Sequence, residues 1–342
     1  MLNFFAQKYI ILRMAVIKKL SFFDKPKLKE LSTFLNFEDK NMFADILTIG
    51  PLGHLHYYLP LKYKFLNESY LLTNDKKTLG LITVNTFSGN PQKINISQLF
   101  FIENAYEVAQ QMIEFIISQY GAMGADTFYV LVDDVYTELS QIFLNNCGFR
   151  QCSYEQIWEA SKTSFKKNNN IKYRRFKNSD IKEVADIYNY SVLQHFKPTL
   201  LRTEEEFRET NISGLRYVNE YRYVIEEPGT GRIIAYFKIA TADNEKYVVD
   251  FNYSDGYEID FDTILSFATR EIIKRTRKFR LFVKMKNYIN TNETQKEYLQ
   301  EMGFSCVSTK NLYIKDFYRV AKEYSPEEGF SVLGGLHNSP TF

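Results

Sequence analysis

Two stretches of the chain end in the same way, and this match decides the fold. Residues 143–149 run Phe-Leu-Asn-Asn-Cys-Gly-Phe, and residues 298–304 run Tyr-Leu-Gln-Glu-Met-Gly-Phe. In both, a helix-like run closes on glycine and a β-rich segment follows, as expected when glycine takes the position just past a helix end. Gly148 and Gly303 are 155 residues apart, because 303 − 148 = 155.

Two further blocks repeat at nearly the same spacing. Gly80 aligns with Ala235, since 235 − 80 = 155, and Asp24 aligns with Asp180, since 180 − 24 = 156. Chance recurrence of common helix-glycine-strand patterns is the alternative, but three blocks in one order favour an internal duplication. The polar stretch Lys166–Asn170 lies between the copies and is typical of a linker.

The duplication predicts the division of the chain. Met14 begins a domain-like segment, so residues 1–13 are expected to be an extension from an upstream start codon. The chain then divides into a first domain (14–164, copy 1), a linker (165–170), a second domain (171–324, copy 2) and an irregular tail (325–342).

Hydrophobic periodicity predicts one order of elements in both copies: strand, helix, three-strand meander, helix, strand, helix, strand. The fold class is therefore α/β (α+β), with a mostly antiparallel mixed sheet flanked by helices in each copy. The expected elements of copy 1 are strands at 16–20, 69–73, 78–87, 93–102, 127–133 and 151–159, and helices at 25–35, 105–120 and 137–147. Those of copy 2 are strands at 171–176, 221–226, 232–240, 247–253 and 278–286, a final strand pair within 305–315, and helices from 181, at 261–275 and at 293–302.

Composition narrows the class of protein. The 342 residues carry a net charge of only +2, which predicts no general attraction to nucleic acid or to a membrane. Cys147, Cys152 and Cys306 are too few and too scattered for a disulfide framework, so a reducing, cytoplasmic location is expected. No apolar run reaches the roughly 20 residues of a membrane helix, and the N-terminus does not look like a signal peptide.

The element order, with Gly-Phe after the last helix of each copy, resembles the GNAT (GCN5-related N-acetyltransferase) family. Ile181–Leu193 looks like the first helix of that family, and Asn292 matches an asparagine that often begins its last helix. The resemblance implies that the last meander strand diverges from the next strand and that acetyl-CoA enters between them. The pyrophosphate then lies at the N-terminus of the following helix, where free N–H groups and the helix dipole favour an anion.

Both copies depart from the family's pyrophosphate loop, which has the pattern Arg/Gln-x-x-Gly-x-Gly/Ala. Copy 2 places Asp255, Glu258, Asp260 and Asp262 there, and these carboxylates repel a pyrophosphate. Copy 1 has Glu103–Val108 there. This segment is more compatible with a pyrophosphate, because Asn104 is able to cap the helix and Ala105 is small. An acetyl-CoA or other acyl-CoA site is therefore expected in copy 1, at Leu99, Phe101, Asn104, Ala105, Tyr106, Glu107 and Val108.

Two residues are candidates for proton transfer. Glu103 lies at the end of the copy 1 meander, where a general base acts on an amine, although a helix-capping role is the alternative. The tyrosine that protonates the thiolate in many family members is replaced by Leu144 and Leu299. Tyr298 is one residue away, which rotates its side chain by about 100°, and core packing is its alternative role.

Other features have simpler explanations beside the functional ones. His54 and His56 share a strand-like alternation but lack a third ligand, so no metal site is expected. Asp250 either orients a substrate amine or faces solvent, and His195 either shapes an amine pocket or packs. The basic residues within 274–286 either contact RNA or form a solvated surface.

The sequence thus favours an acyl-CoA-dependent N-acyltransferase, specifically an N-acetyltransferase, that acts on a small-molecule amine at a site in copy 1. Two alternatives stay open. One is a non-catalytic binding or regulatory protein with the GNAT fold. The other is an aminoacyl-tRNA-dependent transferase, which does not need the CoA loop; the basic residues favour it and the near-neutral charge opposes it.

Overall fold

The computed structural model describes residues 15–24, 27, 31, 68–74, 77–87, 90–102, 106–166, 171–209, 219–241, 243–254 and 261–317. The elements of copy 1 are β1 (Val16–Lys19), η1 (Phe22–Asp24), β2 (Glu68–Thr73), β3 (Thr78–Phe87), β4 (Asn90–Phe101), α5 (Tyr106–Ala122), β5 (Thr127–Asp133), α6 (Thr137–Gln141), the π-helical turn η2 (Ile142–Asn146) and β6 (Arg150–Glu159). Those of copy 2 are β7 (Lys172–Arg175), η3 (Asn178–Asp180), α7 (Ile181–Ser191), η4 (Gln194–Phe196), α8 (Lys197–Leu200), η5 (Glu204–Phe207), β8 (Asn219–Glu226), β9 (Ile233–Thr241), β10 (Lys246–Tyr253), α9 (Phe261–Ile273), β11 (Arg280–Lys286), α10 (Asn292–Glu301) and β12 (Ser305–Asp316).

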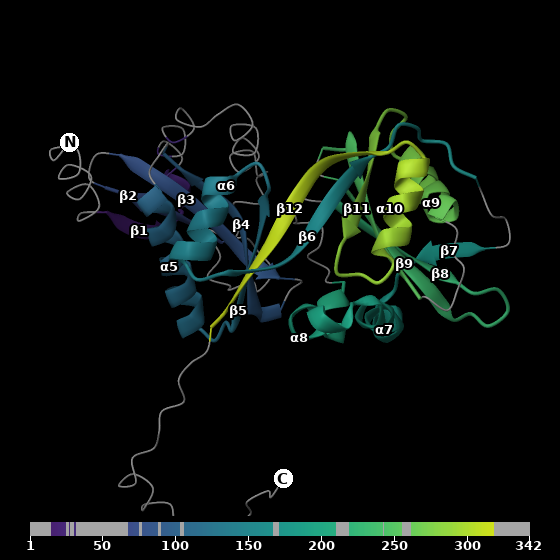
Figure 1. The fold of residues 1–342 in the computed structure, drawn as a ribbon, viewed down its shortest axis with the longest axis horizontal. Helices are drawn as coiled ribbons and strands as arrows, with labels where there is room; N and C mark the ends of the chain where they lie inside the picture. The colour runs from purple at the N-terminus through teal and green to yellow at the C-terminus, as the bar shows by residue number, and fades with distance from the viewer. Residues whose placement is uncertain are drawn as a thin grey trace, which may run out of the picture.

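The described strands form one continuous 12-stranded sheet in the order β1-β2-β3-β4-β5-β12-β6-β11-β10-β9-β8-β7. Most neighbours are antiparallel, but β4 runs parallel to β5, and β10 runs parallel to β11. Helices α5 and α6 lie over the copy 1 part of the sheet and α9 and α10 over the copy 2 part (Figure 1). The predicted fold class, a mostly antiparallel mixed sheet flanked by helices in each half, is confirmed.

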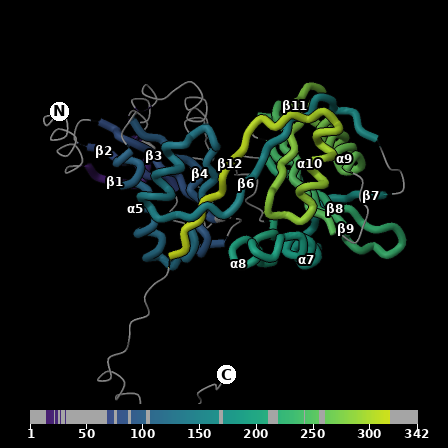
Figure 2. The backbone as a smooth tube through the Cα atoms, viewed as in Figure 1, coloured from purple at the N-terminus to yellow at the C-terminus, as the bar shows by residue number. Residues whose placement is uncertain are grey.

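The two halves exchange their last strands. Strand β12 of copy 2 pairs with β5 of copy 1, with Leu312 opposite Leu131, and β6 of copy 1 pairs with β11 of copy 2, with Trp158 opposite Val283. The exchanged strands then pair with each other in the centre of the sheet, where the tube trace shows them side by side (Figure 2). The final strand pair predicted within 305–315 is wrong, because this segment is the single strand β12 that crosses into the other half.

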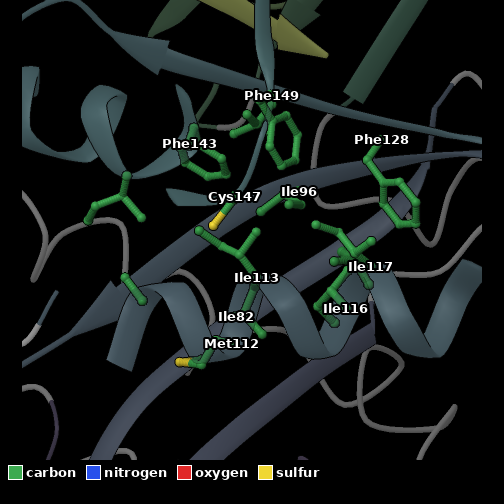
Figure 3. Packing of buried hydrophobic residues seen from close by; sticks show 14 of the residues in the cluster. Ile82, Ile96, Met112, Ile113, Ile116, Ile117, Phe128, Phe143, Cys147 and Phe149 are labelled. Atoms are coloured by element: carbon green, nitrogen blue, oxygen red, sulfur yellow. The ribbon is translucent and has the colours of Figure 1, made fainter. Parts of the chain in front are cut away.

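The hydrophobic core between α5 and the sheet and the core between α9 and the sheet each contain a side chain from the other half. Tyr313 of β12 is buried in the copy 1 core, where its ring stacks on Phe143 at a centroid distance of 6.5 Å. In the same core Phe143, Cys147 and Phe149 face Ile113 of α5 (Figure 3). Trp158 of β6 is buried in the copy 2 core instead. The predicted boundary near residue 165 divides the sequence into two copies. The packed cores do not respect this boundary, because each takes a side chain from the other copy.

The glycines that end the last helices have the expected geometry. Gly148 has a φ of 67° and Gly303 a φ of 76°, the left-handed conformation that glycine adopts without strain. Gly80 is required for a different reason, because a Cβ there would lie 2.7 Å from the sulfur of Met112 and 2.9 Å from the carbonyl oxygen of Phe100. Gly80 of β3 thus lets α5 approach the sheet closely.

The three cysteines are free thiols. Among the described helices, none combines the length and the apolar composition that a membrane crossing requires.

Because the last strands are exchanged, we expect a substitution that destabilises the core of one copy to destabilise the core of the other as well. Tyr313→Ala removes a buried aromatic ring from copy 1 and is expected to lower the free energy of unfolding by about 3–5 kcal/mol. The transition is measured by denaturant unfolding, with the fluorescence of Trp158, the single tryptophan, as the probe of the copy 2 core. Val307→Ala on the same strand, with Val307 49% exposed, serves as the control and should change little. If Tyr313→Ala left the unfolding transition reported by Trp158 unchanged, the two cores would not be coupled.

Candidate functional site

The parallel strand pair in each half separates before its strands end. Strands β4 and β5 pair from Lys93 opposite Thr127 to Ile96 opposite Val130, after which β4 continues as Ser97–Phe101 and β5 as Leu131–Asp133. Strands β10 and β11 pair up to Val249 opposite Val283, and their ends likewise continue without pairing to each other. We call the separated ends of β4 and β5 fork 1, and those of β10 and β11 fork 2.

Backbone amides of β4 point into fork 1. The N–H of Ile102 donates to the carbonyl of Leu79 at 3.0 Å, so Ile102 faces β3. Because facing alternates along an antiparallel strand, the N–H groups of Leu99 and Phe101 face away from β3, toward β5. Fork 1 therefore offers two directed backbone donors from a single strand.

Strand β4 also carries a bulge where the fork opens. Thr83 lies opposite Gln98, but the next residue of β3, Val84, lies opposite Ile96, so Ser97 is the extra residue. Its hydroxyl donates to the carbonyl of Thr83 at 3.1 Å. A bulge bends a strand and increases its twist, which accounts for the separation from β5. The pairing of β10 with β9 in copy 2 shows no such shift.

Helix α5 begins beside fork 1. The Tyr106 ring packs edge-on against Phe101 with centroids 5.8 Å apart, and its hydroxyl donates to Glu138 of α6 at 3.0 Å. Glu107 is in the first turn of α5, and Val108 is buried against the sheet. Of the predicted cofactor residues, the structure thus brings together Leu99, Phe101, Tyr106, Glu107 and Val108. Glu103, Asn104 and Ala105 lie outside the described residues.

Fork 2 is filled on its helical face by aromatic rings. The ring of Phe261, the first residue of α9, lies 5.6 Å from that of Phe251, 5.7 Å from that of Tyr253 and 5.0 Å from that of Tyr298. The Tyr298 hydroxyl donates to Asp262 at 2.8 Å. Tyr298 therefore packs in copy 2, and the structure does not bring it to the residues of fork 1.

Ion pairs fill the other face of fork 2. Asp250 of β10 pairs with Lys286 of β11, whose side chain is only 5% exposed, and Lys284 pairs with Glu155 of β6. The Tyr288 hydroxyl donates to the same Glu155 at 3.0 Å. Asp250 is thus neither an outward-facing residue nor the orienting group for an amine in an open site, the two roles weighed from the sequence. Its carboxylate is held by a buried lysine.

The pairing perturbs the ionisation of these carboxylates. Burial opposes the charged form of Asp250, but attraction to Lys286 and then to Lys284 outweighs it and lowers the pKa of Asp250 to about 2. The same balance, with Lys284 as the strongest attraction, lowers the pKa of Glu155. Both carboxylates are therefore charged at neutral pH and form part of a satisfied network.

Equivalent positions of the two forks carry different side chains. The register places Thr83 and Gln98 of copy 1 where copy 2 has Lys238 and Asp250. Beyond the last parallel pair, Leu131 takes the place of Lys284. Ser97 is exposed, and Gln98 and Leu99 are half-buried, whereas Phe251–Tyr253 are buried. Among the described residues, fork 1 is partly exposed and uncharged at these positions, and fork 2 is closed by charges and rings.

Of the remaining histidine candidates, the structure describes only His195, and it belongs to neither fork. His195 is exposed, with its ring 3.9 Å from that of Phe196, and His54 and His56 lie outside the described residues. The part of the chain that the structure describes contains no cluster of three or more histidine, cysteine or carboxylate side chains able to hold a metal ion.

The basic run is largely neutralised by carboxylates of the chain. Five of its seven members form ion pairs: Lys274 and Arg275 with Glu271, Arg280 with Glu159, Lys284 with Glu155, and Lys286 with Asp250. Lys286 is buried, and Lys284 is only partly exposed. The basic residues that favoured contact with RNA thus mostly form ion pairs within the chain.

A cavity of about 460 Å³ lies at the other end of α5 from fork 1. Cys147 borders it, and burial raises the pKa of this thiol to about 11, so it is protonated and a poor nucleophile at neutral pH. The lining residues are Glu114, Ile117, Ser118, Ala122, Asn146, Cys147, Lys315 and Phe317.

Comparison by structure finds the same two-domain arrangement in other proteins. A tandem GNAT protein from the clavulanic acid biosynthesis pathway superposes with a TM-score of 0.59 at 10% identity, over 88% of this chain and 98% of the other. A GCN5-related N-acetyltransferase from Sphaerobacter thermophilus gives 0.58 at 9% identity, over 89% and 96%. A putative acetyltransferase from Pyrococcus horikoshii gives 0.50 at 10% identity, over 89% and 90%. By sequence, no family model and no curated protein matches the chain.

The network in fork 2 predicts a pH-dependent stability. Because the folded-state pKa of Asp250 lies below the ordinary value of about 3.9, its pairing stabilises the fold above about pH 4, and this contribution is lost as the pH falls toward 2. Asp250→Asn leaves Lys286 without its ion pair and is expected to cost about 3–5 kcal/mol at pH 7, with a smaller difference from the wild type near pH 2.

Chemical denaturation across this pH range measures the effect. Asp134→Asn, at an exposed aspartate in the turn after β5, is the matched control and should change the free energy of unfolding by less than about 0.5 kcal/mol. A difference between wild type and Asp250→Asn that stays constant down to pH 2 would show that the ion pair is not the cause.

Proposed function

Because the chain has the tandem GNAT fold, we propose that it is an acyl-CoA-dependent N-acyltransferase that acts on a small-molecule amine, with acetyl-CoA as the first donor to test. The reaction is assigned to fork 1. The observation that carries this assignment is the contrast between the forks: β4 and β5 separate at a bulge and leave an accessible, uncharged opening, whereas fork 2 is filled by the Asp250–Lys286 pair and aromatic rings.

The donor is proposed to enter fork 1 from the side of α5. A pantetheine arm is an extended chain of amides, and the N–H groups of Leu99 and Phe101 that face the fork are suited to pair with it as a further strand would. The pyrophosphate then lies at the start of α5, where helix N–H groups are directed at an anion. Of the predicted cofactor residues, Tyr106, Glu107 and Val108 are the first residues of α5, and Asn104 and Ala105 directly precede them in the sequence.

The chemical step is acyl transfer by direct attack. The amine nitrogen forms a bond to the thioester carbonyl carbon, the C–S bond breaks, and CoA leaves as a thiolate that takes up a proton. A backbone N–H of β4 in the fork is the proposed donor to the oxyanion. Glu103 is the proposed base that removes the ammonium proton. Tyr106 replaces Tyr298 as the proposed acid for the thiolate, because its ring packs on Phe101 at fork 1.

One observation favours the second candidate, a non-catalytic binding protein with this fold. Glu107 is in the first turn of α5, and Glu138 accepts a hydrogen bond from Tyr106 of the same turn. Two carboxylates near the proposed phosphate position weaken anion binding. Binding of acyl-CoA is therefore the property that separates the two candidates.

Neutralising a first-turn carboxylate tests the position of the donor. Glu107→Gln is expected to tighten acetyl-CoA binding about two- to fivefold, because it removes a like charge from the helix end that faces the phosphates. Asp262→Asn at the equivalent place in copy 2, since 262 − 107 = 155, is the matched control and should leave the Kd unchanged. Calorimetric titration with acetyl-CoA measures both values.

The same titration decides the proposal as a whole. Release of the CoA thiol in the presence of amines measures turnover, and heat on titration measures binding. An effect of Asp262→Asn without an effect of Glu107→Gln would move the site to fork 2. No binding of acetyl-CoA or longer acyl-CoAs at saturating concentration would leave the binding-protein candidate in its place.

A further inference from the structure

The cavity at the far end of α5 is separate from both forks. Its volume is about 460 Å³, and α5 lines it with Glu114, Ile117, Ser118 and Ala122. These positions are three or four residues apart, so they share one face of the helix. Glu114 is the lining residue of α5 nearest to fork 1, and it follows Tyr106 by eight residues, which is about 12 Å along the helix axis. The cavity therefore offers space of the size of a small-molecule site at a second place on copy 1.

One wall of the cavity is an aromatic ring that packing holds in place. The ring of Phe317, directly after β12, lies against Gly121 of α5, where a Cβ would be 2.6 Å from the ring. The same ring meets Phe128 edge-on, with centroids 6.3 Å apart. Ile117 and Ala122 continue this apolar surface. The wall is thus already shaped for the apolar part of a ligand, which lowers the cost of ordering it on binding.

Lys315 supplies a cation to the cavity. Its ammonium donates a hydrogen bond to the carbonyl of Cys147, which fixes the side chain at the cavity edge. Within the described residues no carboxylate pairs with Lys315. Because an ammonium has three donors and one is used, two remain for a ligand.

Glu114 supplies an anion to the same cavity. Gln110, one turn earlier on α5, donates to Glu114 at 2.8 Å and accepts a hydrogen bond from Asn146, another lining residue, at 3.0 Å. This chain of hydrogen bonds orients the carboxylate. No cation in the described part of the chain pairs with Glu114, so its second oxygen remains an acceptor for a ligand.

The two charges lie on either side of one thiol. Burial is the main cause that raises the pKa of Cys147, and of the two charges Glu114 raises this pKa further while Lys315 lowers it. Both groups are therefore close to Cys147, yet among the described residues they form no ion pair with each other. A cation and an anion that line one cavity without pairing are each suited to a ligand group of the opposite sign.

We propose that this cavity binds an α-amino acid with an apolar side chain. The ligand carboxylate accepts hydrogen bonds from Lys315, the ligand ammonium donates to Glu114, and the side chain packs on Phe317. Both charges of an α-amino acid are on groups attached to one carbon, so its whole side chain is left for the apolar wall. A simple amine or a simple acid leaves one of the two protein charges without a partner. The inference does not rest on the proposed function, because the cavity and fork 1 are separate.

Three probes that differ by one charged group test the inference. L-phenylalanine carries both charges, phenethylamine lacks the carboxylate, and 3-phenylpropanoate lacks the ammonium. Calorimetric titration of the full chain is expected to give a Kd for L-phenylalanine at least about tenfold below that for either analogue, since each analogue loses a hydrogen bond between charged groups.

Two variants assign the binding to the cavity. Glu114→Gln is expected to raise the Kd for L-phenylalanine at least about tenfold and to leave the Kd for 3-phenylpropanoate unchanged, because only the ammonium contact is lost. Lys315→Met is expected to have the same effect on L-phenylalanine and to leave phenethylamine unchanged. The matched controls are exposed residues outside the cavity, Glu301→Gln on α10 and Lys310→Met on β12, and both should bind L-phenylalanine as the wild type does.

Equal Kd values for the three probes in the wild type would overturn the inference, and so would the absence of heat with L-phenylalanine up to its solubility limit. Binding of L-phenylalanine that Glu114→Gln leaves unchanged would also overturn it, because the amino acid would then bind elsewhere, as an acceptor amine does at fork 1. Should Lys315→Met fail to fold through loss of the hydrogen bond to Cys147, the probe series and Glu114→Gln still decide.

Discussion

The antiparallel ladder between β6 and β12 is the constraint on which the rest of the structure depends. It joins the last strand of each copy to the last strand of the other, so both half-sheets become one sheet. Each exchanged strand also delivers a side chain to the opposite core, Tyr313 to copy 1 and Trp158 to copy 2. Neither core is complete without the other half, which makes the duplicated chain one packing unit although its sequence is two repeats.

Although the two half-sheets are joined, the two forks differ in structure: fork 1 is open and fork 2 is closed. An open fork removes strand-to-strand hydrogen bonds and exposes backbone, so it costs stability. In copy 2 the same place is closed by Asp250, Lys286, Lys284 and Glu155, and one of these, Glu155, comes from the exchanged strand β6. The closed fork is thus stabilised by both copies.

The duplicated fold could be predicted from the sequence because its signals are local. Gly148 and Gly303 end helices in the left-handed conformation, and short runs of apolar and aromatic residues mark strands such as Thr127–Asp133. Strand exchange could not be predicted, because β6 and β12 have the same apolar alternation whether they pair within or between copies. The bulge at Ser97 was missed for a similar reason: it shows only when the register against β3 is known. Of the candidate site, the β4 and α5 positions were predicted from the family resemblance.

The buried ion pair of Glu206 with Lys93 was missed because its signal is not in the sequence neighbourhood of Glu206. Residues 204–206 are three consecutive glutamates, and nothing in such a run marks one of them as buried. Glu205 faces solvent and pairs with Arg208 of its own turn, whereas Glu206 turns inward and meets Lys93, 113 residues earlier in the chain. The difference arises from the exchange of the last strands, because that ladder places the α8–η5 segment of copy 2 against β4, β5 and β6. A carboxylate that is ordinary in copy 2 thereby becomes a buried charge on the face of copy 1, paired with Lys93 of β4. In this tandem chain a buried ion pair of one copy is therefore completed by the other copy, which local sequence patterns do not reveal.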